Sequence, residues 1–244
     1  MTAWWIALQF LTRLPVTLAD MPQPQQVGRS LLFYPLVGLL IGALLYVELL
    51  FTATAPTLLQ AALVLATWIA LTGALHIDGL ADSADAWVGG LGDKERTLRI
   101  MKDPASGPVA VVTLILLMLV KFSALVAILE AGDVIWLILV PWVARVALPL
   151  LFLTTPYTRE GGLGTLLTEH MPRKQLRLVL LMHGVAMLLT GLAGLVVLLT
   201  AGIVFGYLRL LMLKRLGGCT GDTAGALVEI TECIVLVSLA LTLG

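Results

Sequence analysis

Residues 109–129 read VAVVTLILLMLVKFSALVAIL, and this apolar run decides the class of fold. A helix needs about 20 mainly apolar residues to cross about 30 Å of hydrocarbon. The run meets that requirement with Lys121 as its single charge. We therefore predict a transmembrane helix over these residues.

Composition extends this prediction to the whole chain. Of its 244 residues 59% are hydrophobic and 12% are charged, against about 25% charged residues in soluble domains. We predict seven spans, of which the sixth is short and interrupted by Arg209. Before the first span, Trp4, Trp5 and Phe10 predict a short interfacial helix. The predicted spans lie near Leu31–Thr52, Leu58–Leu75, Val109–Leu129, Val134–Leu153, Leu176–Leu199, Gly202–Leu213 and Thr223–Leu243. The fold class is thus an all-α, polytopic transmembrane helical bundle of about seven spans plus short interfacial helices, in a single integral-membrane domain over residues 1–244.

Basic residues are distributed unequally about these spans. Of the fifteen Lys and Arg residues, three lie inside spans, and the other twelve lie in or next to the connections on one side. Those connections are residues 1–30, 76–106, 155–175 and 214–222. The opposite connections, near residues 53–57, 130–133 and 200, have none. Because Lys and Arg concentrate on the cytoplasmic side of membrane proteins, we predict a multi-pass protein of the bacterial cytoplasmic (inner) membrane with its first side in the cytoplasm. The zero formal net charge gives no reason to expect nucleic-acid binding.

An acidic motif, HIDGLADSAD, occupies residues 76–85 at the predicted cytoplasmic end of the second span. If the helix continues through it, Asp78, Asp82 and Asp85 lie at i, i+4 and i+7 on one face. Three carboxylates so placed repel one another, and a hard divalent cation such as Mg²⁺ would neutralise them. The alternative is a solvated helix end. His76 is either a base or a hydrogen-bonded bystander.

A glycine-rich motif, GGCTGDTAGA, occupies residues 217–226 and leads into the last span. Such a loop presents unpaired backbone N–H groups and the positive end of a helix dipole, which together suit a phosphate. Thr220 and Gly221 are then candidate phosphate contacts, and Asp222 is a candidate fourth metal ligand. Alternatively, Thr220 or Asp222 only caps the helix, while Gly221 and Gly225 allow close helix packing.

Two further groups of charges have competing interpretations. Residues 93–103, DKERTLRIMKD, predict a short amphipathic helix that ends before Pro104, and its basic face would bind either phosphate or anionic lipid headgroups. Charges inside spans are costly in lipid, so we favour structural ion pairs for them. The predicted pairs join Arg145 to Glu229 and Glu232, and Lys121 to Glu48.

Taken in chain order, these segments resemble the cobalamin synthase family, also called adenosylcobinamide-GDP ribazoletransferases. The acidic block followed by the Gly-Gly-x-Thr-Gly-Asp block is specific to that family. The matching stretches are residues 10–15 (FLTRLP), Arg29 with 34–38 (YPLVG), 76–82 with Asp85, 101–103 (MKD), Tyr157 with Gly162-Leu163-Gly164, and 217–222. The chain departs from the family at Ala86, where glycine is frequent, and at residues 103–107, which lack the arginine of an Asp-Ser-Arg-x-Gly run. The missing arginine weakens the case for a phosphate contact from that turn.

The resemblance implies a Mg²⁺-dependent transfer late in vitamin B12 assembly. A ribose hydroxyl of alpha-ribazole or alpha-ribazole 5′-phosphate attacks the corrinoid-side phosphorus of adenosylcobinamide-GDP, and GMP leaves. On this assignment Asp78, Asp82, Asp85 and Asp222 hold one or two Mg²⁺ ions, and an aspartate (Asp78 or Asp82) or His76 takes the proton. Substrate binding would fall to Arg29, Arg99, Lys102, Asp103, Arg159, Thr220 and Gly221. Membrane lipid is the other expected partner, and a homo-oligomer is left open.

Two other functions compete with this one. A CDP-alcohol phosphotransferase also sets aspartates on membrane helices around metal ions, but its usual signature pairs them with an Ala-Arg step and two further acids that this chain lacks. A cation-coupled transporter would use the charges inside the spans, yet transporter sites lie near the bilayer midplane, often between repeated halves, and the sequence has no repeat. Three aligned aspartates argue against a noncatalytic scaffold.

Overall fold

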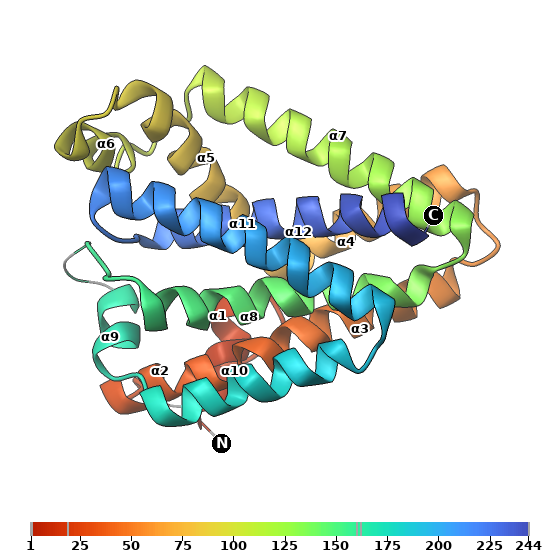
Figure 1. Cartoon of the computed structure of the whole chain (residues 1–244), viewed down its shortest axis with the longest axis horizontal. Coiled ribbons are helices and arrows are strands. Elements are labelled where there is room, and N and C mark those ends of the chain that lie inside the picture. Colours follow the sequence, from red (N-terminus) through yellow and green to blue (C-terminus); the bar gives the residue numbers. More distant parts are fainter. Residues whose placement is uncertain (1, 19, 160, 162, 244) are drawn as a thin grey trace.

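The computed structural model describes residues 2–18, 20–159, 161 and 163–243. Over these residues the chain forms twelve α-helices and two short 3-10 helices, and no β-strand, which confirms the predicted all-α class. Figure 1 shows the long helices running side by side along the longest axis, with α6 and α9 at one end and the C-terminus towards the other.

Seven of the helices correspond to the predicted spans. They are α3 (Tyr34–Phe51), α4 (Thr57–Thr72), α7 (Pro108–Ala131), α8 (Leu139–Thr154), α10 (Arg173–Leu188), α11 (Leu192–Leu216) and α12 (Gly221–Leu243). The remaining elements are α1 (Thr2–Leu11), α2 (Pro24–Ser30), η1 (Leu31–Phe33), α5 (Leu75–Gly89), α6 (Lys94–Ile100), η2 (Val134–Ile138) and α9 (Leu163–Glu169).

Burial separates central helices from lipid-facing ones. In the apolar windows of α8 and α12, 72% and 67% of the residues are buried, against 22% in both α7 and α11. A soluble protein would not leave two long apolar helices so exposed to water. The chain is therefore a multi-pass membrane protein whose core lies around α8 and α12.

The number of spans is slightly smaller than predicted. Within the described chain, five helical segments are long and apolar enough to cross a membrane, and the bent pair α4–α5 would make a sixth. The predicted span that falls short is α10, whose 16 residues rise about 24 Å, less than the hydrocarbon thickness. Its first turn is also basic.

The turn between α10 and α11 corrects the sequence prediction. It lies at residues 189–191, whereas the sequence suggested Thr200. Gly191 adopts a φ of +79°, a left-handed conformation that glycine accepts without steric cost. Gly202, near which the division was predicted, lies inside α11 with open space around it. The three connections at this end of the bundle still contain no Lys or Arg, so the charge asymmetry is unchanged.

A sharp break separates α4 from α5. The two helices are bent by 88°, because Gly73 and Ala74 both adopt left-handed backbone conformations with φ of +63° and +56°. Arg13, which follows α1, covers Gly73 and donates its backbone N–H to the Leu71 carbonyl oxygen at 2.7 Å. The second span therefore does not continue into the acidic motif as predicted. Instead, α5 is a separate helix that packs along α12.

The N-terminal helix α1 is docked on the bundle. Ile6, Ala7, Leu8 and Leu11 are buried, and α1 packs against α2 and α3. The predicted short helix is present, but one of its faces belongs to the protein core.

Four charged residues form a buried ion cluster between α7, α8 and α12. Lys121 Nζ lies 2.7 Å from carboxylate oxygens of both Glu229 and Glu232, and Arg145 pairs with Glu232. The predicted pairing of Arg145 with Glu232 is confirmed. The predicted pair of Lys121 with Glu48 is wrong: Glu48 instead accepts a hydrogen bond from a threonine of α4. The depth of Lys121 along its helix did not predict its ion-pair partner, because the long side chain reaches the carboxylates on α12.

Candidate active site

The site is built where α5 and α12 approach each other closely. A Cβ added to Gly79 would lie 2.7 Å from the Asp222 carbonyl oxygen, and one added to Gly225 would lie 3.1 Å from the His76 carbonyl oxygen. Glycine at both positions therefore permits the approach, as small residues do in membrane helix pairs. The packing interpretation holds for Gly225 but not for Gly221, whose added Cβ would make only an ordinary contact at 3.8 Å.

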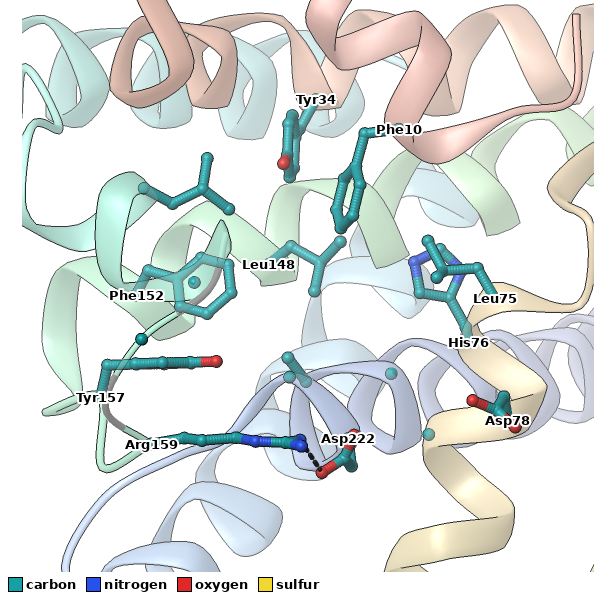
Figure 2. Close-up of a pocket in the computed structure, with 17 residues that line it drawn as sticks. Phe10, Tyr34, Leu75, His76, Asp78, Leu148, Phe152, Tyr157, Arg159 and Asp222 are labelled. Carbon is teal, nitrogen blue, oxygen red and sulfur yellow. Dashed lines mark hydrogen bonds and ion pairs between the residues drawn. The ribbon is translucent and has the colours of Figure 1, made fainter. Parts of the chain in front are cut away.

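This approach brings the two acidic motifs together. Asp78 on α5 and Asp222 on α12 line the same cavity (Figure 2). Asp78, Asp82 and Asp85 all lie within α5, which confirms their predicted helical spacing. The carboxylates of Asp78, Asp222 and Asp85 all repel the charge of Asp82, and the Arg159 guanidinium attracts it. The site is thus a carboxylate-rich region with one nearby cation.

Arg159 is that cation, and two connected loops hold it in place. Its Nη1 lies 3.2 Å from Asp222 Oδ2, the ion pair drawn in Figure 2. The Thr158 backbone N–H donates to the Cys219 carbonyl at 2.9 Å, and the Cys219 N–H donates to the Pro156 carbonyl at 2.8 Å. These bonds tie the segment after α8 to the glycine-rich motif and so place Arg159 beside Asp222.

Thr220 caps the last helix. Its hydroxyl accepts from the Thr223 N–H at 3.2 Å, and the Thr223 hydroxyl accepts from the Thr220 N–H at 2.9 Å. This reciprocal pair follows the logic of a capping box. Thr220 is fully buried, and its hydroxyl also lies 3.5 Å from Asp222 Oδ2. The capping interpretation of Thr220 is confirmed.

Asp85 has a structural role that sequence reasoning missed. Its two carboxylate oxygens accept hydrogen bonds from the Gly107 and Ala110 backbone N–H groups, the latter at 2.9 Å. Gly107 is the N-cap residue of α7 and has no side chain with which to cap the helix, and Ala110 lies in the first turn. A carboxylate stabilises unpaired N–H groups and the dipole at such a terminus. Asp85 therefore joins α5 to α7.

The central cavity has two chemically different sides. Its volume is about 400 Å³, and Asp78, Asp222 and Arg159 form its charged side. Four aromatic residues line the rest of the cavity, and we call them the aromatic wall: Phe10 and Tyr34 across from Asp222, then Phe152, and Tyr157 beside Arg159 (Figure 2). Burial raises the pKa of the Tyr157 hydroxyl above its ordinary value.

Two more cavities adjoin the central one. The second cavity, of about 240 Å³, is lined by residues that include Lys102, Arg159, Thr220 and Asp222. The third, of about 450 Å³, is lined by residues that include Tyr157, Arg159, Thr165, Thr168, Glu169 and Arg173. Because Arg159 lines all three cavities, a group bound to its guanidinium lies where they meet.

His76 connects the central cavity to the buried ion cluster. The residue is buried and lines the cavity, and Arg145 Nη2 lies 3.5 Å from its Nδ1. Arginine can only donate hydrogen bonds, so Nδ1 is the accepting nitrogen in this contact. Any action of His76 on a substrate would therefore come from Nε2.

The predicted substrate-binding residues divide into two groups. Lys102, Arg159 and Thr220 line the second cavity, and Gly221 lines the central one. Arg29, Arg99 and Asp103 are described by the structure but line none of the three cavities. Asp103 accepts a hydrogen bond from the Ala105 N–H at 3.0 Å within its own turn. Gly162, part of the family resemblance, lies outside the described residues.

The aromatic wall was not predicted. Phe10, Tyr34 and Tyr157 stand in motifs that carry the family resemblance, but the sequence analysis gave these residues no role. Leu148 and Phe152, four residues apart on α8, both line the cavity. Within a uniformly apolar span, nothing in the sequence distinguishes them from residues that face lipid.

Comparison with known proteins identifies the family of this chain. The sequence profile of the cobalamin-5-phosphate synthase family matches residues 3–240. An adenosylcobinamide-GDP ribazoletransferase of Ectopseudomonas mendocina is 60% identical, over 98% of this chain and 98% of its own. Proteins of the same name from Pseudomonas aeruginosa and Pseudomonas syringae pv. syringae are 62% and 57% identical, over 97% and 99% of this chain and 96% and 100% of their own. No solved structure matches the chain. With a profile that covers nearly its whole length and relatives of such high identity, the chain belongs to the cobalamin-5-phosphate synthase family.

Proposed function

We propose that this chain is an adenosylcobinamide-GDP ribazoletransferase, acting as a single integral-membrane domain. It joins adenosylcobinamide-GDP to alpha-ribazole or alpha-ribazole 5′-phosphate and releases GMP. The observation that carries the proposal is the convergence of Asp78, Asp222 and Arg159 at one cavity, in a chain about 60% identical to proteins of that name. Two acidic groups from different helices and one arginine suit a diphosphate that binds together with a divalent cation.

We further propose Mg²⁺ as the cofactor, held by one or two carboxylates among Asp78, Asp82 and Asp222 together with the substrate diphosphate. Among the residues that the structure describes, no three His, Cys, Asp or Glu side chains are close enough to enclose a metal ion alone. Mg²⁺ does not need such an enclosure, because one or two carboxylates usually bind it together with waters and substrate phosphates. The mutual repulsion of these carboxylates supports the proposal. When bound, the ion neutralises diphosphate charge and stabilises the departing GMP.

The other residues position the reacting groups. Arg159, already paired with a carboxylate, would exchange that partner for a phosphate oxygen, and Lys102 would add a second positive charge from the second cavity. In-line attack by the acceptor ribose hydroxyl depends chiefly on such positioning and charge neutralisation. Asp78 and His76 both line the central cavity and are the candidates for taking the hydroxyl proton, with Asp82 a turn away. Asp85 is the weakest candidate metal ligand, because both of its carboxylate oxygens already accept hydrogen bonds at the start of α7.

We propose that the site faces the cytoplasm from a bacterial inner membrane. The support is the concentration of Lys and Arg at the end of the bundle that holds α6, α9 and the start of α10. The transporter alternative loses its main support, because Lys121 and Arg145 are paired with Glu229 and Glu232 inside the bundle.

The test is GMP release by detergent-purified protein given adenosylcobinamide-GDP, alpha-ribazole 5′-phosphate and Mg²⁺. We expect release to need both substrates and the metal, and to fall at least about 100-fold in Asp78→Asn. Glu130→Gln, an exposed acid at the opposite end of the bundle, is the matched control and should keep wild-type activity. Binding of Mn²⁺, followed by electron paramagnetic resonance as a stand-in for Mg²⁺, should weaken in Asp78→Asn and Asp222→Asn and stay unchanged in Glu130→Gln. Wild-type protein that releases no GMP would refute the function.

A further inference from the structure

The aromatic wall of the central cavity has no task in phosphate chemistry. Phe10 and Tyr34 stack with ring centroids 6.2 Å apart and an interplanar angle of 28°. Phe152 and Tyr157 meet edge to face, also at 6.2 Å, with an angle of 66°. These residues come from α1, α3, α8 and the segment after α8, not from the acidic motifs. Four separate parts of the chain thus bring aromatic rings to this cavity, with Phe10 and Tyr34 across it from Asp222 and Arg159 (Figure 2).

The size of the cavity restricts what lies against this wall. Pockets of about 300–1,000 Å³ hold ligands of ordinary small-molecule size. At about 400 Å³, the central cavity can hold a nucleoside. A corrin ring with its side chains is far larger. The corrinoid therefore must lie mainly outside, and the wall contacts one of the two nucleotide bases in the reaction.

The chemistry of the wall distinguishes between those bases. The polar atoms that the wall offers are the hydroxyls of Tyr34 and Tyr157, and the rest of this side is carbon from Phe10, Leu148 and Phe152. Guanine carries acceptors at N7 and O6 and a donor at N2, and leaving them unpaired in an apolar setting is costly. Alpha-ribazole carries dimethylbenzimidazole, a flat bicyclic base with an apolar, methylated edge. Such a base suits stacking on aromatic rings without further polar partners.

We infer that the aromatic wall is the subsite for the base of the acceptor nucleoside and sets its specificity for apolar benzimidazole bases. This inference rests on the proposed function. With the base on the wall, the ribose extends across the cavity towards Asp78, Asp222 and Arg159, where its hydroxyl meets the diphosphate. The second cavity, which shares Arg159 and Asp222 with the central one and is also lined by Lys102, is left for the diphosphate of the donor.

Two variants of opposite kind test the subsite. Phe10→Ala removes one ring from the half-buried edge of the wall, and Leu148→Trp fills the cavity from α8. The matched control is Phe205→Ala, a partly buried aromatic residue of α11 outside the cavity. Kinetics of GMP release give KM for acceptor and donor separately. Equilibrium dialysis with alpha-ribazole alone measures acceptor binding without turnover, and thermal unfolding in detergent confirms that each variant is folded.

We expect both wall variants to raise KM for the acceptor and weaken alpha-ribazole binding by about 5- to 100-fold. Phe10→Ala does so by removing a ring on which the base stacks, and Leu148→Trp by occupying the space of the base. KM for adenosylcobinamide-GDP should stay within about twofold of wild type, and Phe205→Ala should change neither. If wild type is active but folded wall variants bind alpha-ribazole normally, or raise KM for the donor instead, the subsite assignment is overturned. If wild type releases no GMP, the proposed transferase function is wrong. In that case, alpha-ribazole binding to wild type that is lost in the wall variants would still support the subsite.

Discussion

Replacing Gly79 by alanine adds one methyl group at the closest contact between α5 and α12. The new Cβ would lie 2.7 Å from the Asp222 carbonyl oxygen, and an ordinary contact begins at 3.4 Å. Because the obstacle is backbone, the helices themselves must separate. The separation moves Asp78 away from Asp222. Overpacking of this kind costs about 1–3 kcal/mol of stability. Since a misplacement of about 1 Å can cost about 100-fold in rate, we expect GMP release to fall roughly 10- to 100-fold.

The control for this prediction is the same substitution where space is open. Gly206→Ala, inside α11, meets nothing within 4 Å, and alanine in a helix is favoured over glycine by about 1 kcal/mol. That variant should be fully active and at least as stable as wild type. Both variants are compared by GMP release and by thermal unfolding in detergent. Wild-type activity and stability in Gly79→Ala would refute the close approach as the basis of the site.

The remaining predictions concern stability. Lys121→Met leaves Glu229 buried without its partner, and we expect a loss of about 3–5 kcal/mol in unfolding free energy, measured by denaturant titration in detergent. Exposed Lys174→Met should change it by less than about 0.5 kcal/mol. Asp85→Ala removes both acceptors at the start of α7 and should cost about 1–2 kcal/mol. Its Mn²⁺ affinity should stay near wild type; a marked loss would make Asp85 a metal ligand instead.

Much of the fold follows from the sequence, because apolar length and the distribution of Lys and Arg reflect the bilayer directly. What failed were the junctions between helices. Arg209 seemed to interrupt a span, yet in α11 it donates hydrogen bonds to Thr155 and to the Thr154 carbonyl. The break at Gly73 and Ala74 depends on Arg13, which is distant in sequence, and no local pattern reveals such a contact.

The site was predictable only in part, and for a related reason. Helical spacing placed Asp78 and Asp82 on α5, and motif order linked them to Asp222. The roles of Asp85 and of the aromatic wall depend on tertiary contacts. In the sequence, an aspartate that caps a helix looks the same as an aspartate that binds a cation. Likewise, an apolar side chain that faces a cavity looks the same as one that faces lipid.

The buried ion cluster has a consequence for how the protein is made. Lys121 and Arg145 are synthesised in α7 and α8, but both carboxylates that neutralise them belong to α12, which is synthesised later. An unpaired charge inside the bilayer costs several kcal/mol. Until α12 is inserted, we expect α7 and α8 to stay in the insertion machinery or to remain incompletely inserted, because their charges are unpaired. A chain truncated before Glu229 is therefore expected to be recognised as unfinished and degraded.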